Sequence, residues 1–404
     1  MRRLSIMSYA GLAFAALGVA CSRPVSLDWK VDLAAASLCT PLVTSKFIAV
    51  GHERGVSLVE PNGDLRCTFE ARGEVIGRPA TDGALIFFGS TNYIFYAIDA
   101  ACREVWKFAT RDRIKSDALY EGGRVFLSSY DGHVYALDAA SGAQRWTFPP
   151  PEPPLEEALA ALAAEVVAGE IGAPRKVVSA TRTLAIPSIP PAAGVSADPT
   201  TEVGDFSYSS PVIAAGVLYI GNLDGHIYAL GVSDGRLLWR FATGAAVTST
   251  PIVAERILYT GSNDTVIYAL ELSTAEGTAP SVLWQYATRD WVNSTAALAD
   301  GVLYVGSNDR HVYALAAQTG AFLWRFETKG PVVSTPAVYQ NLLVATGGSG
   351  DGTIYVLSRS SGALFWQHAT EGKIESDPVV AGDHVYVTSA DHYLYAYRIR
   401  QVPP

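Results

Sequence analysis

Three histidines, His133, His226 and His311, stand just after an aspartate-containing turn at corresponding points of a repeated phrase. Imidazole is the commonest metal ligand among side chains, so this recurrence raises the question of a metal site. Equivalent residues of a repeat lie on separate sheets about 10 Å apart, whereas zinc holds its nitrogen ligands at about 2 Å. No pair of histidines or cysteines has a metal-binding spacing such as Cys-x-x-Cys. We therefore expect no metal site and interpret these histidines as part of the repeat.

Other patterns that could support chemistry are also incomplete. The glycine-rich run from Gly347 to Gly352 lacks the lysine and the following helix of a phosphate-binding loop. No Gly-x-Ser-x-Gly nucleophile elbow occurs in the chain. The net charge of −9 argues against a nucleic-acid partner, because such proteins generally carry a basic surface. The sequence thus predicts a protein that is not an enzyme, binds no cofactor and binds no nucleic acid.

The repeated phrase indicates the fold. The pattern x-x-Asp-Gly-x-x-Tyr-Ala-Leu has four clear copies and three weaker ones, around Tyr135, Tyr228, Tyr268 and Tyr313 and around Tyr96, Tyr355 and Tyr395. A small residue marks the segment that we predict as strand A of each unit, at Cys39, Gly77, Ser116, Ser209, Ser249, Ser294, Ser334 and Ser376. Units of about 40 residues are typical of propeller blades. The sequence therefore predicts an all-β fold, an eight-bladed β-propeller of four-stranded antiparallel blades.

The last unit of the repeat lacks a segment for its fourth strand. It stops after Tyr395-Ala396-Tyr397, whereas Leu27-Asp28-Trp29-Lys30-Val31 stands alone before the first unit. We expect this N-terminal strand to complete the eighth blade, because such a closure removes exposed sheet edges. The fourth strands of the blades carry tryptophans that we expect to dock blade on blade, at Trp29, Trp106, Trp146, Trp239, Trp284, Trp324 and Trp366.

One insertion and a leader lie outside the repeat. The insertion spans about residues 149–205, between blades 3 and 4, and begins with three prolines that cannot pair as a strand. Leu155, Leu159 and Leu162 then share one face of a predicted helix. Residues 1–20 have the basic start and apolar stretch of an export signal, which leaves residues 21–404 as a single propeller domain.

The end of the leader resembles a bacterial lipobox. In Leu17-Gly18-Val19-Ala20-Cys21, small residues precede a cysteine, and the resemblance implies that Cys21 is lipidated and becomes the mature N-terminus. Acyl chains would then hold the protein at a membrane surface without spanning it. The alternative is an ordinary cleaved signal followed by a chance cysteine.

The segment Ala136-Leu137-Asp138-Ala139-Ala140-Ser141-Gly142-Ala143-Gln144-Arg145-Trp146 resembles the tryptophan-docking repeat of the quinoprotein (PQQ-like) propellers. Together with the lipobox and the lack of catalytic motifs, it resembles the BamB family of outer-membrane assembly lipoproteins. That resemblance implies a monomeric, non-catalytic scaffold that faces the periplasm, and we expect it at the outer rather than the inner membrane. Its expected partners are envelope proteins such as a β-barrel assembly complex, with a lipid anchor in the membrane.

Two other classes of function stay open. One is a propeller module that binds a small molecule or a glycan in its central funnel. The other is a degenerate quinoprotein dehydrogenase. Dehydrogenases with this repeat carry adjacent cysteines and a calcium-held cofactor, and the chain has no adjacent cysteines.

The resemblance also implies a role for two cysteines. In this family each docking tryptophan lies against the glycine turn of the next blade. Cys67 occupies the tryptophan position of blade 1, and Cys102 occupies the glycine-turn position of blade 2. Because disulfides persist in exported proteins, we predict a Cys67–Cys102 disulfide, with two buried free thiols as the alternative. Cys39 remains as a buried filler.

A partner-binding rim is predicted from loop composition. In four-stranded blades the D-to-A and B-to-C connections share one rim, so the predicted helix with Leu155, Leu159 and Leu162 lies there. The same rim carries the loops Arg111-Asp112-Arg113 and Arg289-Asp290-Trp291. An aromatic residue in a charged loop can anchor an interface, although a packed loop residue is the alternative interpretation of Trp291.

Overall fold

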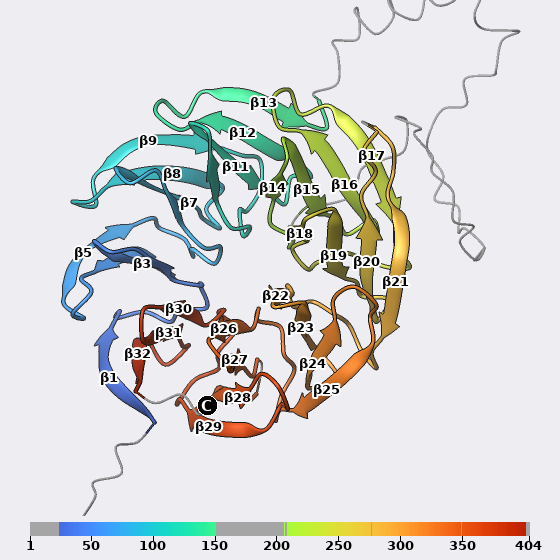
Figure 1. The fold of residues 1–404 in the computed structure, drawn as a ribbon. Coiled ribbons are helices and arrows are strands. Elements are labelled where there is room, and N and C mark those ends of the chain that lie inside the picture. The colour runs from blue at the N-terminus through green and yellow to red at the C-terminus, as the bar shows by residue number, and fades with distance from the viewer. Residues whose placement is uncertain (1–23, 151–205, 207, 276, 349, 401–404) are drawn as a thin grey trace, which may run out of the picture.

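The computed structural model describes residues 24–150, 206, 208–275, 277–348 and 350–400. These residues form eight four-stranded antiparallel sheets, arranged as blades around a central axis (Figure 1). The predicted eight-bladed β-propeller is therefore confirmed. In the described part of the chain, no helix is long and apolar enough to cross a membrane.

The strands of each blade are called A to D from the axis outward, and in blades 1 to 7 they follow chain order (Figure 1). In blade 8 the outer strand D is the N-terminal strand. Blades 1 to 4 consist of β2 (Leu42–Val43), β3 (Ile48–His52), β4 (Gly55–Val59) and β5 (Leu65–Glu70); β6 (Ala80–Thr81), β7 (Leu85–Gly89), β8 (Ile94–Asp99) and β9 (Glu104–Ala109); β10 (Leu119–Glu121), β11 (Arg124–Ser128), β12 (Val134–Asp138) and β13 (Gln144–Phe148); and β14 (Val212–Ala214), β15 (Val217–Gly221), β16 (His226–Gly231) and β17 (Leu237–Ala242).

Blades 5 to 8 have the same plan. They consist of β18 (Ile252–Ala254), β19 (Ile257–Gly261), β20 (Val266–Glu271) and β21 (Ser281–Ala287); β22 (Ala297–Ala299), β23 (Val302–Ser307), β24 (His311–Ala316) and β25 (Phe322–Glu327); β26 (Ala337–Tyr339), β27 (Leu342–Thr346), β28 (Thr353–Ser358) and β29 (Leu364–Ala369); and β30 (Val379–Ala381), β31 (His384–Thr388) and β32 (Tyr393–Ile399) together with β1 (Val25–Asp32).

The N-terminal strand closes the ring. β1 pairs antiparallel with β32, beginning with Val25 opposite Ile399. Trp29 on β1 also lies against Gly63 of blade 1, where an added Cβ would come within 2.8 Å of the indole. Because β1 completes the last sheet and contacts the first blade, the predicted closure by residues 27–31 is confirmed.

Docking tryptophans join neighbouring blades. Trp106 lies on Gly142 of the next blade, where an added Cβ would come within 2.6 Å of the indole, and its Nε1–H donates to the Ala139 carbonyl at 2.9 Å. Gly142 has a φ of 72°, so both its backbone conformation and the close ring favour glycine. The same contact occurs in four other pairs: Trp29 with Gly63, Trp146 with Gly235, Trp284 with Gly320, and Trp324 with Gly362.

Two of the predicted docking residues differ from this pattern. Trp239 is buried, but Gly277 in the C-to-D connection of blade 5 lies near the Leu238 carbonyl and not against the indole. Trp366 packs edge-to-face on Tyr397 of blade 8. Blade 8 has no C-to-D turn, because its strand D comes from the other end of the chain. The expected tryptophan–glycine contact is therefore replaced at these two positions.

A second clamp uses the aspartate and tyrosine of the repeat. In blade 6 the Tyr313 hydroxyl donates to the Asp309 carboxylate at 2.5 Å. The same carboxylate accepts the backbone N–H of Arg289, from the loop that leaves blade 5, at 3.0 Å. Burial and the Asp309 carboxylate raise the pKa of Tyr313. The hydroxyl–carboxylate bond recurs between Tyr135 and Asp131, Tyr228 and Asp224, Tyr268 and Asp264, Tyr355 and Asp351, and Tyr395 and Asp391.

Candidate functional site

Loop segments that lead into strand A lie near the axis of the ring, at the inner ends of the blades (Figure 1). Residues 113–117, which connect β9 to β10, show the pattern: Ile114 and Ser116 are buried, whereas Arg113, Lys115 and Asp117 are more accessible. This alternation buries one set of side chains and leaves the other set more accessible. The corresponding segments are residues 36–40, 74–78, 208–210, 246–250, 291–295, 331–335 and 373–377.

The small residues of the repeat lie in these segments, in bends that precede strand A. There they touch the next blade. The Ser209 hydroxyl donates to the Ser249 carbonyl at 3.1 Å, and a Cβ added to Gly77 would lie 2.0 Å from the Ser116 carbonyl oxygen. The prediction that the small residues belong to strand A is wrong, because these segments bond from blade to blade before the strand ladder begins.

Two aspartates, Asp117 and Asp377, come one residue after the small residues of blades 3 and 8. The Asp377 carboxylate accepts the Thr335 N–H at 2.6 Å, and the Asp117 carboxylate accepts the Arg78 N–H at 2.8 Å. Burial raises the pKa of Asp377 to about 6, and the Asp117 carboxylate adds to this rise. Burial likewise raises the pKa of Asp117. Both carboxylates thus bond neighbouring blades together at a place where their ionisation is unfavourable.

The loops that lead into strand A of blades 3 and 4 form a basic and aromatic cluster with the B-to-C turn of blade 3. The Arg113 guanidinium lies 4.9 Å and the Lys115 ammonium 5.1 Å from the centre of the Tyr130 ring. Tyr208 packs edge-to-face on Tyr130 with ring centres 5.6 Å apart, yet it remains 56% exposed. Cation–π contacts at exposed sites contribute about 0.5–1 kcal/mol each. This cluster therefore offers an ordered aromatic and cationic surface to solvent.

The predicted rim loop of blade 3 is held by its backbone. The Arg111 N–H donates to the Asp131 carboxylate at 2.9 Å, which fixes this loop to the B-to-C turn of its own blade. Asp112 forms an ion pair with Arg113 at 3.5 Å. The Arg111 side chain is exposed, so the loop presents charge from a fixed backbone.

The predicted rim loop of blade 6 presents an exposed indole. Trp291 is 50% exposed, although its backbone is held: the backbone N–H donates to the Asp290 carboxylate at 2.8 Å, and the backbone carbonyl accepts the Asn308 N–H at 2.8 Å. The backbone N–H of Arg289 donates to the Asp309 carboxylate, which fixes the start of this loop. The blade 6 loop and the Arg111–Arg113 loop lie on the same rim but three blades apart, so the structure does not bring them into one continuous patch.

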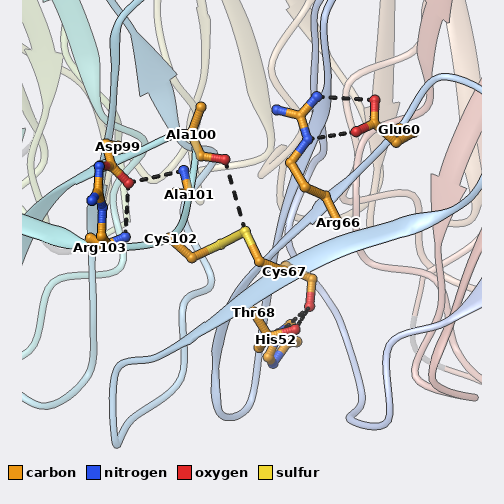
Figure 2. Close-up of a disulfide and its surroundings, with 11 residues drawn as sticks. His52, Glu60, Arg66, Cys67, Thr68, Asp99, Ala100, Ala101, Cys102 and Arg103 are labelled. Atoms are coloured by element: carbon orange, nitrogen blue, oxygen red, sulfur yellow. Dashed lines mark hydrogen bonds and ion pairs between the residues drawn. A yellow bond between two sulfur atoms is a disulfide. The ribbon is translucent and has the colours of Figure 1, made fainter.

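Cys67 and Cys102 form a disulfide between blades 1 and 2 (Figure 2). Their sulfur atoms are 2.13 Å apart and their Cα atoms 6.1 Å apart. Cys102 has a φ of 59°, similar to that of the docking glycines. The Asp99 carboxylate supports this turn by accepting the N–H groups of Ala101 and Arg103 (Figure 2). The bond therefore takes the place of a tryptophan–glycine contact.

The histidines of the repeat and the unpaired Cys39 were the other side chains considered for metal or thiol chemistry. The Nδ1 atoms of His133 and His311 lie 2.9 Å from the carbonyl oxygens of Asp131 and Asp309, so each ring is bound within its own turn. Across the described ranges, no group of three or more histidine, cysteine, aspartate or glutamate side chains is arranged to hold a metal ion. Cys39 is a buried free thiol whose pKa burial raises to about 12.

Comparison with models of known protein families assigns the chain to a family. The family model described as outer membrane protein assembly factor BamB matches residues 27–182, 192–291, 278–350 and 340–401, which is most of the sequence. The chain belongs to the BamB family. No curated protein matches it.

Two solved structures support the BamB-like fold. BamB from Moraxella catarrhalis superposes with a TM-score of 0.69 at 18% identity, covering 93% of this chain and 99% of the other. The computationally designed Ika8 protein superposes with a TM-score of 0.67 at 14% identity, covering 91% of this chain and 99% of the other. At such identities the likeness concerns the fold alone.

Several predictions for this BamB-family chain fall outside the described residues. They are the export signal over residues 1–20, the lipidation of Cys21, and the helical face of Leu155, Leu159 and Leu162. These remain predictions. Sequence reasoning also missed the Tyr–Asp clamp, although its signal was present as an aspartate four residues before six of the seven repeated tyrosines; the exception is Tyr96, where Asn92 stands at that position.

Proposed function

We propose that the protein is a non-catalytic scaffold of the cell envelope, with a BamB-like role in outer-membrane protein assembly. It binds partner proteins through the loop rim and is held at the outer membrane by a lipid on Cys21. Family membership supports the general role. The observation that carries the choice of surface is Trp291, an indole that is 50% exposed on a loop fixed by backbone hydrogen bonds.

The physical reason is preorganisation. A tryptophan buries on the order of 150–250 Å² when it is covered, and such residues are frequent centres of binding energy at interfaces. Because the backbone of Trp291 is already fixed, a partner that covers the indole does not have to order the loop. Arg289 and Asp290 beside it, and the basic and aromatic cluster at blade 3, supply charges that set orientation.

The test is capture of partners from detergent-solubilised membranes by the tagged full chain, read by mass spectrometry. We expect an outer-membrane assembly protein in the eluate, and at least a tenfold lower yield with Trp291→Ala. Phe322→Ala is the matched control, because Phe322 is also 50% exposed on blade 6 but lies on the outer strand β25. Equal capture by Trp291→Ala and the wild type would rule out this surface.

A deletion of residues 150–204 tests the insertion separately. If it folds and still captures the same partner at full yield, the insertion does not form part of the binding rim. Absence of any envelope protein from the wild-type eluate would contradict the scaffold function itself.

A further inference from the structure

A cavity of about 190 Å³ opens on the loop rim where blades 8, 1 and 2 meet. Leu38 and Val75 form apolar parts of its wall, and the B-to-C turns of blades 1 and 8 contribute His52, Glu53 and Ala390. Pockets for drug-sized ligands generally measure about 300–1,000 Å³. This cavity is smaller than that range, and its volume suits a single long side chain.

Blade 1 differs from the repeat at this place. In blade 6, Ser307 pairs with His311 across a turn of three residues, whereas in blade 1 His52 pairs with Gly55 across a turn of two. Ser57 occupies the position of the repeated tyrosine, and its hydroxyl lies 3.0 Å from His52 Nε2. Blade 1 thus lacks both the aspartate and the tyrosine of the clamp, which explains why space remains here.

The walls of the cavity are fixed by backbone bonds. The Glu53 N–H donates to the Ala36 carbonyl and the Val75 N–H donates to the His52 carbonyl, both at 3.1 Å. The Glu74 N–H donates to the Thr91 hydroxyl at 2.9 Å. A group that enters the cavity therefore meets a preformed site, and binding costs little loop ordering.

The charge of the cavity is negative. Glu74 is half-buried and Glu53 is exposed at the mouth, and none of the ion pairs between described residues uses either carboxylate. The one lysine of the wall, Lys373, is engaged by Glu375 at 2.9 Å. Burial lowers the pKa of His52 to about 4, so its ring adds no positive charge at neutral pH.

We propose that this cavity receives the cationic side chain of an arginine or lysine presented by a partner protein. The methylene groups pack on Leu38 and Val75, as long basic side chains do on apolar surface. The charged head meets the carboxylates of Glu74 and Glu53, and charge-assisted hydrogen bonds of this kind are the stronger ones. The inference deepens the proposed scaffold function and rests on it only for the statement that the cation belongs to a protein.

The test uses the purified full chain and N-acetyl-L-argininamide as the probe, followed by NMR shifts of the backbone amides. We expect saturable shifts at Glu53, Glu74 and Val75, and at least fivefold weaker binding by Glu74→Gln. The neutral isostere N-acetyl-L-citrullinamide should bind at least tenfold more weakly. Glu121→Gln is the matched control, because it removes the same charge from an exposed residue at the A-to-B turn of blade 3 and should leave binding unchanged.

A second variant guards against an effect on folding. Ala36→Phe keeps both carboxylates but fills the cavity from its wall, and it should abolish the shifts without changing the melting temperature by more than a few degrees. Equal binding of the citrulline probe, or unchanged binding by Glu74→Gln, would overturn the proposal. Tighter binding of spermidine than of the arginine probe would assign the site to a free polyamine and overturn the protein side chain. Because no partner is present, failure of the Trp291 capture experiment leaves this result unaffected.

Discussion

Replacing both cysteines of the Cys67–Cys102 bond by serine should lower the free energy of unfolding by about 4 kcal/mol. The two residues are 35 positions apart in the sequence. In the chain-entropy model, a cross-link across such a loop removes about 13 cal/mol/K from the unfolded chain, which is about 4 kcal/mol at 25 °C. No other disulfide joins the described blades, because Cys39, the remaining cysteine among the described residues, is a free thiol.

A repaired variant tests whether the disulfide substitutes for the clamp of the repeat. In Cys67→Trp/Cys102→Gly, the new indole would face a glycine, as Trp106 faces Gly142. Loss of a docked tryptophan generally costs about 3–5 kcal/mol. Glycine at position 102, where φ is 59°, relieves about 1–2 kcal/mol of left-handed strain. The repaired variant should therefore unfold within about 2 kcal/mol of the oxidised wild type.

Guanidinium unfolding followed by tryptophan fluorescence measures these differences, provided that the variants share one m-value. The oxidised wild type, the wild type with reductant and the two double variants are compared. Reductant should make the wild type resemble the serine variant, because the buried Cys39 thiol, with a pKa of about 12, does not exchange in its place. The reasoning is refuted if the serine variant keeps the wild-type midpoint, or if the repaired variant is as unstable as the serine variant.

Three further predictions concern the ring. Trp146→Ala should lower the free energy of unfolding by about 3–5 kcal/mol, because the indole is buried on Gly235; an unchanged denaturation midpoint would contradict the docking role. Tyr313→Phe should cost about 1–3 kcal/mol in the same assay by removing a donor from the buried Asp309 carboxylate, and a neutral effect would mean that water replaces the hydroxyl. Asp377 has a raised pKa in the native state, so the native state binds more protons than the unfolded state and stability falls as pH rises from about 4 to about 6. Asp377→Asn should reduce this slope, to which the raised pKa of Asp117 also contributes, and stabilise the protein at pH 7 by about 1–3 kcal/mol; melting curves between pH 4 and 7 that stay parallel to the wild type would contradict it.

Much of the ring could be predicted from the sequence because its constraints are local and repeated. The last unit lacks a fourth strand, and the strand around Trp29 has no unit of its own. Pairing the two completes eight four-stranded blades, so the closure of the ring could be predicted from the number of strands. The disulfide was predicted from the family resemblance, which implies that the tryptophan position of one blade touches the glycine turn of the next. Both inferences use the equivalence of positions in the repeat, and the second also needs the packing that the resemblance supplies.

The predictions that proved wrong or were missed concern positions where one blade differs from the others. The prediction placed the small residues in strand A because each stands between hydrophobic positions. A segment that bonds to the next blade has the same sequence pattern as a strand that bonds within its own sheet. Trp239 and Trp366 face blades whose C-to-D connection is irregular or absent, and the tryptophan itself carries no sign of this. The cavity beside Glu53 and Glu74 depends on a turn that is one residue shorter than in blade 6, and single-residue differences in turns are the least readable feature of a repeat.

The same reasoning indicates where recognition must lie. Tryptophan–glycine contacts, Tyr–Asp clamps and the ring of small residues use the repeated polar and aromatic groups to hold blade on blade. Those groups are satisfied inside the molecule, so they have little left to offer a partner. The position three residues before the small residue of each unit is different, because its side chain varies from blade to blade. Blades carry Ala36, Glu74, Arg113, Trp291 and Lys373 there. A ring of eight similar blades has no inherent orientation toward a partner, and these unlike side chains give it an acidic side, a basic and aromatic side and a single exposed indole. Exchanging Glu74 and Arg113 by a double charge swap should therefore disturb partner capture while leaving the melting temperature nearly unchanged, because neither side chain belongs to a clamp.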